Sequence, residues 1–286
     1  MVEQMVERVF EGARQQLPFQ VYRQKARAYV NGLVVGHRSV PPSCIHLTFA
    51  LPRPFSRGKM IGYFFYSLVS LQNHTRMASC TSLLAEVRAC TLCAKHLPLG
   101  PRPVVQLHPS ARILIAGQAP GRKVHETGVP FNDASGDRLR AWLGISRETF
   151  YDSRQVAILP MGFCFPGTGK SGDLPPRPEC APAWRERLLS LLTNLRLTLV
   201  IGQYAQAYHL PNERVSLTEA VQVWRNHWPL TVPLPHPSPR NNLWIKRNPW
   251  FEKELLPVLR TRVAEVLAAP PGKPLHSTRA KSARAG

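Results

Sequence analysis

Short apolar runs alternate with amphipathic stretches through the middle of the chain. Four runs suit buried strands, at residues 111–116, 155–159, 197–201 and 231–234. The stretches between and beside them predict helices, at residues 83–87, 137–142, 183–193, 205–209 and 250–267. Strands that alternate with helices indicate a parallel sheet that is covered on both faces. We therefore expect an α/β fold, a three-layer α/β/α sandwich with a central four-stranded parallel sheet.

Both ends of the chain depart from this pattern. Residues 1–76 mix apolar and basic residues with breakers such as PPS and LPRP, and they show no sustained period after the first twenty positions. We expect residues 1–76 to be a poorly ordered N-terminal extension, for which an over-long gene model is one explanation. Residues 77–268 then form the folded domain, and residues 269–286 form a basic, disordered tail.

The charge balance favours an anionic partner. The formal net charge is +20, and basic residues are in excess in the middle of the chain as well as at both ends. A basic domain favours a polyanion such as DNA, although solubility alone is the plainer explanation. The longest apolar run, Ile61–Leu71, is too short to span a bilayer, and the first residues lack the apolar segment of a signal peptide. We expect a monomeric cytoplasmic protein, nucleoid-associated if bacterial, with no membrane partner.

Unusual residues follow the first and the last predicted strand. The first strand runs into GQAPG at Gly117–Gly121, and small residues at a strand end let backbone N–H groups approach a ligand closely. The spacing fits neither a dinucleotide nor a P-loop motif, and a plain connecting turn remains the alternative. The last strand runs into His236 and a Pro-rich loop that carries Arg240 and Asn241. Such a rigid, extended loop could press on a nucleic-acid backbone, whereas a structural histidine is the alternative.

Four of the six cysteines have metal-ligand spacing. Cys90 and Cys93 form a C-x2-C pair, and Cys164 and Cys180 follow later in the chain. Four thiolates suit a [4Fe–4S] cluster or a zinc ion, and four unrelated thiols are the alternative. Cys44 and Cys80 look incidental.

Taken in order, these motifs resemble the iron–sulfur branch of the uracil-DNA glycosylase superfamily. The shared features are C-x2-C, the spacing from Gly117 to Phe131, C-x15-C, an IG-x-x-A turn after the third strand, and the H-P-x loop at His236. The resemblance covers Cys90 to about Leu259. It implies a central four-stranded parallel sheet, as the strand pattern does.

The resemblance also implies roles for individual residues. Gly117, Gln118, Ala119, Pro120 and Gly121 would line the site for water and base. Phe131 would stack on an extruded base, and His236 would stabilise the departing base anion. Ser238, Pro239 and Arg240 would enter the minor-groove side of the DNA. Cys90, Cys93, Cys164 and Cys180 would ligate a structural [4Fe–4S] cluster.

Two positions depart from the pattern of that branch. Gln118 stands where the branch usually has Glu, and Gln can orient water but cannot act as a base. Asp133 lies in a D-A-S-G segment that resembles a related branch of broader base range. It is our candidate for positioning water, and a helix N-cap is its alternative role. Pro160 stands where the branch has an Asn that reads the edge of uracil, so the preferred base stays open.

We therefore expect a hydrolase, a DNA glycosylase of base-excision repair that flips out uracil or another deaminated base and cleaves its N-glycosidic bond. Its partner would be DNA that contains damaged bases. One alternative is a catalytically weak DNA-binding protein of the same fold. Another is a zinc or iron–sulfur protein without a base site.

Overall fold

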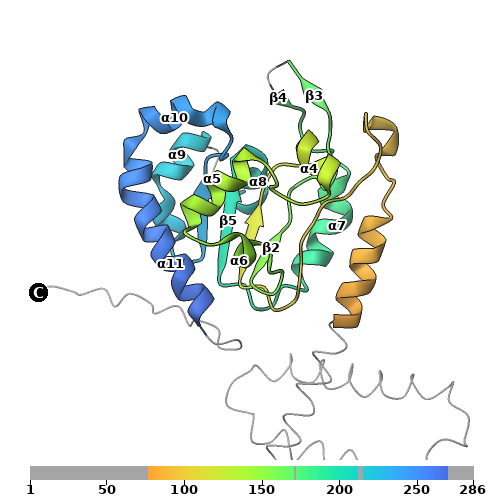
Figure 1. Cartoon of the computed structure of the whole chain (residues 1–286), viewed down its shortest axis with the longest axis horizontal. Helices are drawn as coiled ribbons and strands as arrows, with labels where there is room; N and C mark the ends of the chain where they lie inside the picture. Colours follow the sequence, from red (N-terminus) through yellow and green to blue (C-terminus); the bar gives the residue numbers. More distant parts are fainter. Residues whose placement is uncertain (1–76, 171, 212–214, 270–286) are drawn as a thin grey trace, which may run out of the picture. The chain divides into compact units, whose positions relative to one another are not determined.

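The computed structural model describes residues 77–170, 172–211 and 215–269. The expected N-terminal extension and all but the first residue of the expected tail lie outside these residues. The described chain forms a four-stranded parallel sheet between two layers of helices (Figure 1). The strands are β1 (Ile113–Ala116), β2 (Val156–Ile158), β5 (Leu197–Ile201) and β6 (Thr231–Leu234), in the order β2-β1-β5-β6. The expected three-layer α/β/α sandwich is therefore confirmed.

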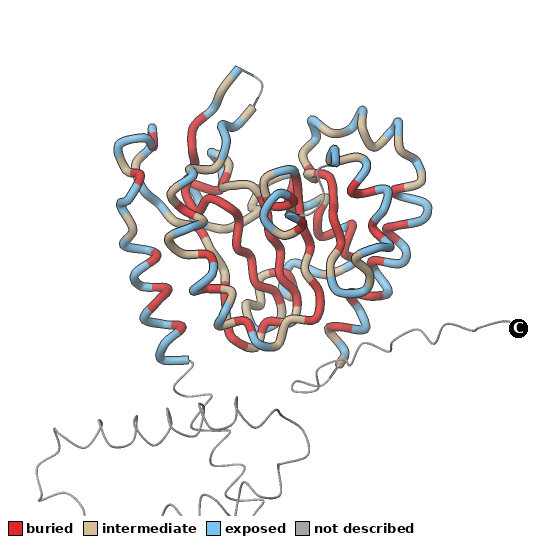
Figure 2. The backbone as a smooth tube through the Cα atoms, turned by 180° about the vertical axis from the view of Figure 1, so that it is seen from behind, coloured by how far each residue is buried: buried red, intermediate tan, exposed pale blue. Residues whose placement is uncertain are grey.

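Alternating side chains of the strands serve two separate cores. Ile113 and Ile115 belong to the core that also contains Trp142, whereas Leu114 belongs to a core on the other face with Leu188. Successive side chains of a strand point to opposite faces, so a strand covered on both sides must be apolar at every position. Every residue of β1 and β2 is accordingly buried, and the strands of the sheet are mostly buried in Figure 2.

The first core is covered by α5 (Ala134–Leu143), α6 (Arg147–Tyr151) and α11 (Leu256–Ala268). The second is covered by a helix over residues 77–88 and by α7 (Cys180–Leu189). The remaining helical elements are η3 (Ala94–His96), α4 (Arg122–Thr127), α8 (Gly202–His209), α9 (Leu217–Gln222), η4 (Trp224–His227), η5 (Pro239–Asn241), α10 (Asn242–Arg247) and η6 (Phe251–Leu255). A small antiparallel hairpin joins β3 (Thr168–Gly169) to β4 (Gly172–Asp173).

Several helix boundaries differ from the expected ones for local reasons. The first helix extends back to residue 77, and α5 begins at Ala134 because Asp133 caps it. The last helix is divided into the π-helical turn η6 and α11. Pro257, near the start of α11, has no N–H and cannot donate a hydrogen bond to the carbonyl one turn earlier. The wider π-helical turn η6 accommodates this missing hydrogen bond.

The strand order places the reversal of the chain path beside β1. From β1 the chain moves outward to β2, and it then returns to the other side of β1 to form β5 and β6. In open parallel sheets, ligands bind beyond the carboxyl ends of the strands at such a point. The motif residues that follow β1, β2 and β6 all lie at this edge. Within the described residues, no helix is long and apolar enough to cross a membrane.

Candidate functional site

A pocket lies beyond the carboxyl ends of β1, β2 and β6, and most of the residues predicted to be catalytic or to contact the base line it. They are Gly117, Gln118, Ala119, Pro120, Phe131, Asp133 and His236, together with Pro160. The lining also includes Val104, Val124, Pro130, Ser135 and Ile158, which the sequence did not single out. Gly121, Ser238, Pro239, Arg240 and Asn241 do not line it. The structure thus brings the predicted catalytic residues together and places the predicted DNA-binding loop beside them.

Hydrogen bonds hold the turn after β1 against the segment after β2. The carbonyls of Gly117 and Gln118 accept from the N–H groups of Met161 and Gly162, at 2.8 and 2.9 Å. The side-chain amide of Gln118 donates to the carbonyl of Leu174 at 3.3 Å, just beyond the β3–β4 hairpin. The Gln118 amide therefore links the pocket to the hairpin.

The backbone of Phe131 is strained, because its φ of 53° lies in the left-handed region that large side chains avoid. The ring of Phe131 packs edge-on against Phe150, with centroids 6.1 Å apart. The hydroxyl of Tyr151 donates to the carbonyl of Pro130 at 3.0 Å. The backbone of Phe131 also approaches Gly136 so closely that a Cβ at position 136 would lie 1.7 Å from the Phe131 carbonyl oxygen. These contacts fix the aromatic ring at the wall of the pocket.

Asp133 is the N-cap of α5, and it also lines the pocket. Its Oδ1 accepts from the Gly136 N–H at 3.0 Å, so it is the N-cap of α5. Its side chain also lines the pocket, close enough to His236 for its negative charge to raise the pKa of that ring. The cap therefore positions the carboxylate at the pocket.

The local contacts of His236 determine which ring nitrogen carries its proton. Nδ1 accepts from the Ser238 N–H at 3.2 Å, so the neutral ring carries its proton on Nε2. Burial lowers the pKa of His236, and the charge of Arg240 acts in the same direction. The charges of Asp133 and Asp173 raise this pKa; each influence is smaller than that of burial and larger than that of Arg240. The ring is therefore neutral at pH 7, with an N–H donor on Nε2.

Hydrogen bonds hold the loop after His236, and the expected extended conformation is wrong for part of it. Pro239–Asn241 form the 3-10 turn η5, because the Ser238 hydroxyl accepts from the Arg240 N–H and caps the turn. Arg138 of α5 donates to the Ser238 carbonyl at 3.1 Å. The Asn241 amide donates to the His236 carbonyl at 2.7 Å. Helix α5 thus supports both Asp133 and the loop.

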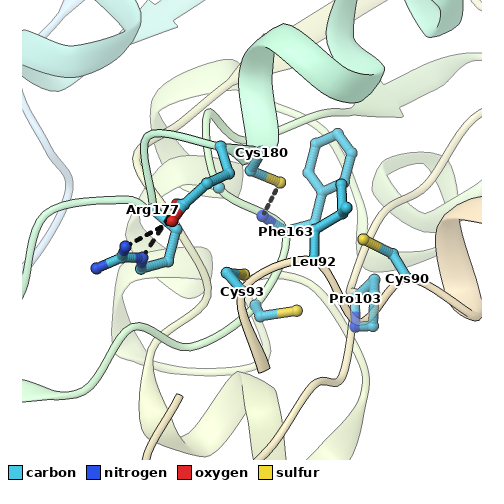
Figure 3. A pocket seen from close by; sticks show the side chains of 10 residues that line it. Cys90, Leu92, Cys93, Pro103, Phe163, Arg177 and Cys180 are labelled. Carbon is cyan, nitrogen blue, oxygen red and sulfur yellow. Dashed lines mark hydrogen bonds and ion pairs between the residues drawn. The ribbon is translucent and has the colours of Figure 1, made fainter. Parts of the chain in front are cut away.

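A second, smaller cavity is lined by all four predicted metal-ligating cysteines, Cys90, Cys93, Cys164 and Cys180 (Figure 3). The Phe163 N–H donates to the Cys180 sulfur at 3.3 Å. The indole of Trp184 donates to the Cys90 sulfur at 3.2 Å. Cys80 packs in the second core and does not line this cavity, and Cys44 lies outside the described residues.

Burial raises the pKa of the Cys164 thiol to about 11 and that of Cys180 to about 12. The neighbouring cysteines act in the same direction as burial and are smaller contributions to these values. A metal centre would have to displace these protons, because only thiolates bind metals. Four thiols with N–H donors aimed at two of them suit a cluster ligand set. As the side chains are placed, however, no group of three or more His, Cys, Asp or Glu residues in the described chain could hold a metal ion. The [4Fe–4S] centre therefore stays a prediction.

Two further residues near the pocket escaped the sequence analysis. The Asp173 carboxylate of β4 would lie 3.3 Å from a Cβ added at Gly121, so it flanks the turn after β1. Arg185 of α7 is fully buried and donates to the carbonyls of Leu159 and Pro160, both at 2.9 Å. Neither has a distinctive sequence pattern, since each is one charged residue among several in its segment.

The family model of the uracil DNA glycosylase superfamily matches residues 105–260. The match runs from just before β1 into α11, and it includes every residue that lines the pocket after β1 except Val104. Of the four cysteines, Cys164 and Cys180 fall inside the matched segment.

Proposed function

Because this chain belongs to the uracil DNA glycosylase superfamily, we propose that it is a DNA glycosylase of base-excision repair that releases uracil or another deaminated base. The observation that carries the proposal is the meeting of Gln118, Phe131 and His236 in one pocket at the carboxyl edge of the sheet. A base inside a duplex cannot reach such a pocket, so its nucleotide must first be flipped out of the stack.

The pocket offers a surface for the base and a donor for its developing charge. The Phe131 ring can stack on the flipped base, a contact worth about 1–3 kcal/mol. When the bond from C1′ to the base nitrogen breaks, its electron pair stays on the base. The Nε2–H of the neutral His236 can then donate to a carbonyl oxygen of the base and stabilise the anion.

Water completes the hydrolysis from the other side of the sugar. Its oxygen bonds to C1′ as the base departs, and the proton that it loses passes to the Asp133 carboxylate and finally to the departed base anion. Asp133 can accept a hydrogen bond from this water through Oδ2, since its Oδ1 is engaged by the Gly136 N–H. Gln118 cannot take the proton, but its amide can orient the water.

The loop of Ser238, Pro239, Arg240 and Asn241 is the proposed contact to DNA beside the flipped base. Arg240 is exposed at its tip. Lys246 and Arg247 follow in the last turn of α10. Contacts from these side chains to phosphates would make binding depend on salt.

Cys90, Cys93, Cys164 and Cys180 would hold a [4Fe–4S] cluster as a structural centre. The proposal rests on their shared cavity and their thiol chemistry. Such a centre would supply a crosslink between the segment before β1, the loop after β2 and the start of α7.

The test is strand cleavage at the resulting abasic site. Single- and double-stranded oligonucleotides bearing uracil, hypoxanthine or xanthine would be incubated with the protein and with a His236→Ala variant. Removing one such electrostatic group costs about 10²–10³-fold in rate. His108→Ala is the matched control, because His108 precedes β1 at the opposite end of the strand. No cleavage of any substrate by the intact protein would refute the proposal.

A catalytically weak DNA-binding protein of the same fold is the second candidate. Gln118 and Pro160 favour it, because both replace residues that the iron–sulfur branch usually uses. It predicts DNA binding without cleavage in the same assay. A zinc or iron–sulfur protein without a base site predicts neither.

A further inference from the structure

The segment that follows β2 has its backbone polar groups engaged within the protein. The N–H groups of Leu159, Met161 and Gly162 donate to carbonyls of Ile115, Gly117 and Gln118. Pro160 has no N–H group. The carbonyls of Leu159 and Pro160 both accept from Arg185. Pro160 nevertheless lines the base pocket, so this wall presents a proline ring to a base.

Arg185 donates the hydrogen bonds that both carbonyls accept. It is fully buried on α7, and one of its nitrogens, Nη1, makes both hydrogen bonds. Its Nη2 lies 2.6 Å from Nε2 of His209, and its guanidinium lies 5.1 Å from the centre of the Tyr208 ring. No carboxylate of the described residues pairs with it. Burial lowers the pKa of Arg185 to about 10, so it remains charged at neutral pH.

Burying a cation without a carboxylate partner lowers the stability of the fold. If Arg185 only filled space, an apolar side chain of similar volume would give a more stable protein. The contacts that offset its burial are His209, the Tyr208 ring and the two carbonyls, and of these the carbonyls belong to the segment at the pocket wall. The charge of Arg185 therefore acts on the orientation of the Leu159–Pro160 backbone.

We propose that Arg185 is a specificity-determining positioning residue, which holds both carbonyls away from the base so that the Pro160 wall carries no hydrogen-bonding group. The inference rests on the proposed glycosylase function and deepens it. Such a wall selects by shape and stacking. Hydrogen-bonded recognition is left to the other walls, at Gln118, Asp133 and His236. The pocket therefore accepts more than one deaminated base, uracil and hypoxanthine among them.

The test compares kcat/KM on uracil and hypoxanthine oligonucleotides among variants at this wall. In Arg185→Met the carbonyls lose their donor and can turn toward the base, and the ratio of the two substrates changes by about tenfold or more. In Arg185→Lys a single ammonium group can replace Nη1, and the ratio stays within about threefold of the parent protein. Pro160→Asn adds an amide to the wall and raises the preference for uracil by about tenfold or more. Arg187→Met is the matched control, since Arg187 is an exposed residue of the same helix that pairs with Glu86.

Equal losses on both bases in Arg185→Met and an unchanged ratio in Pro160→Asn would overturn the inference while leaving the glycosylase function intact. Cleavage of uracil alone by the parent protein would also overturn it. Should Arg185→Met fail to fold, Pro160→Asn carries the same comparison. Should the parent protein cleave neither base, the glycosylase proposal fails. In that case the preference of each variant is measured as the ratio of its affinities for free uracil and free hypoxanthine, in the presence of abasic DNA. Equal effects of the variants on both affinities, or no base binding, would overturn the inference as well.

Discussion

Gly136→Ala should damage the base pocket more than it damages the fold. A Cβ at this position would lie 1.7 Å from the Phe131 carbonyl oxygen, whereas real Cβ atoms essentially never come within 3.0 Å of a neighbour. The carbonyl or α5 must therefore move by more than about 1 Å, a displacement that can cost roughly 10²-fold when it misplaces a reacting group. Phe131 is already strained at a φ of 53°, so its backbone has little freedom to absorb the shift.

The assay is kcat/KM on the best-cleaved oligonucleotide together with the free energy of unfolding. We expect a loss of about 10²-fold in kcat/KM. Ala141→Gly, at an exposed position of the same helix, is the control. It should cost about 1 kcal/mol of stability through helix propensity and leave kcat/KM unchanged. If Gly136→Ala kept the parent kcat/KM, the reasoning that Phe131 is held in place by the close approach to α5 would be refuted.

Three further predictions concern the pH dependence of stability, the cysteines and salt. The pKa of His209 is lowered to about 4 by burial and by Arg185. The unfolded chain binds the proton more tightly, so stability is fully present above about pH 6.5 and declines as pH falls toward 4. In His209→Gln, which keeps an acceptor for Arg185, this decline in Tm should flatten, and an unchanged profile would contradict the assignment. Cys164→Ser should lower bound iron and sulfide together, while equal metal content in both proteins would exclude Cys164 as a ligand. Arg240→Gln should reduce the slope of log affinity for DNA against log salt by about 1, and an unaltered slope would show that Arg240 makes no phosphate contact.

The strands could be predicted because a parallel strand buried on both faces must be a continuous apolar run. The run at residues 197–201 matches β5 at both ends, and 231–234 matches β6. The β3–β4 hairpin was missed because two-residue strands rich in glycine show no alternation. Helix α9 was also missed, although its sequence carries a readable capping box in Ser216 and Glu219.

The site was predictable where chemistry follows a strand end, and unpredictable where burial decides the role of a residue. His236 and Gln118 come straight after apolar runs, so the topology alone places them at one edge of the sheet. Arg185 lies in an amphipathic segment that also contains Arg187, and only the complete burial of Arg185 distinguishes the two. The left-handed backbone of Phe131 also has no sequence marker, because it results from contacts with Gly136 and Tyr151.

The loop after β2 contributes residues to both cavities, and it therefore links the cysteines to the wall of the base pocket. Pro160 lines the base pocket, and Gly162, Phe163 and Cys164 line the cysteine cavity within four residues of it. Helix α7 begins at Cys180, and one turn later it carries Arg185, which binds the carbonyl of Pro160. Anything that crosslinks Cys164 to Cys180 therefore fixes both ends of the contact that shapes the pocket wall. A metal centre at the cysteines would then influence base selection through position alone, without touching the base.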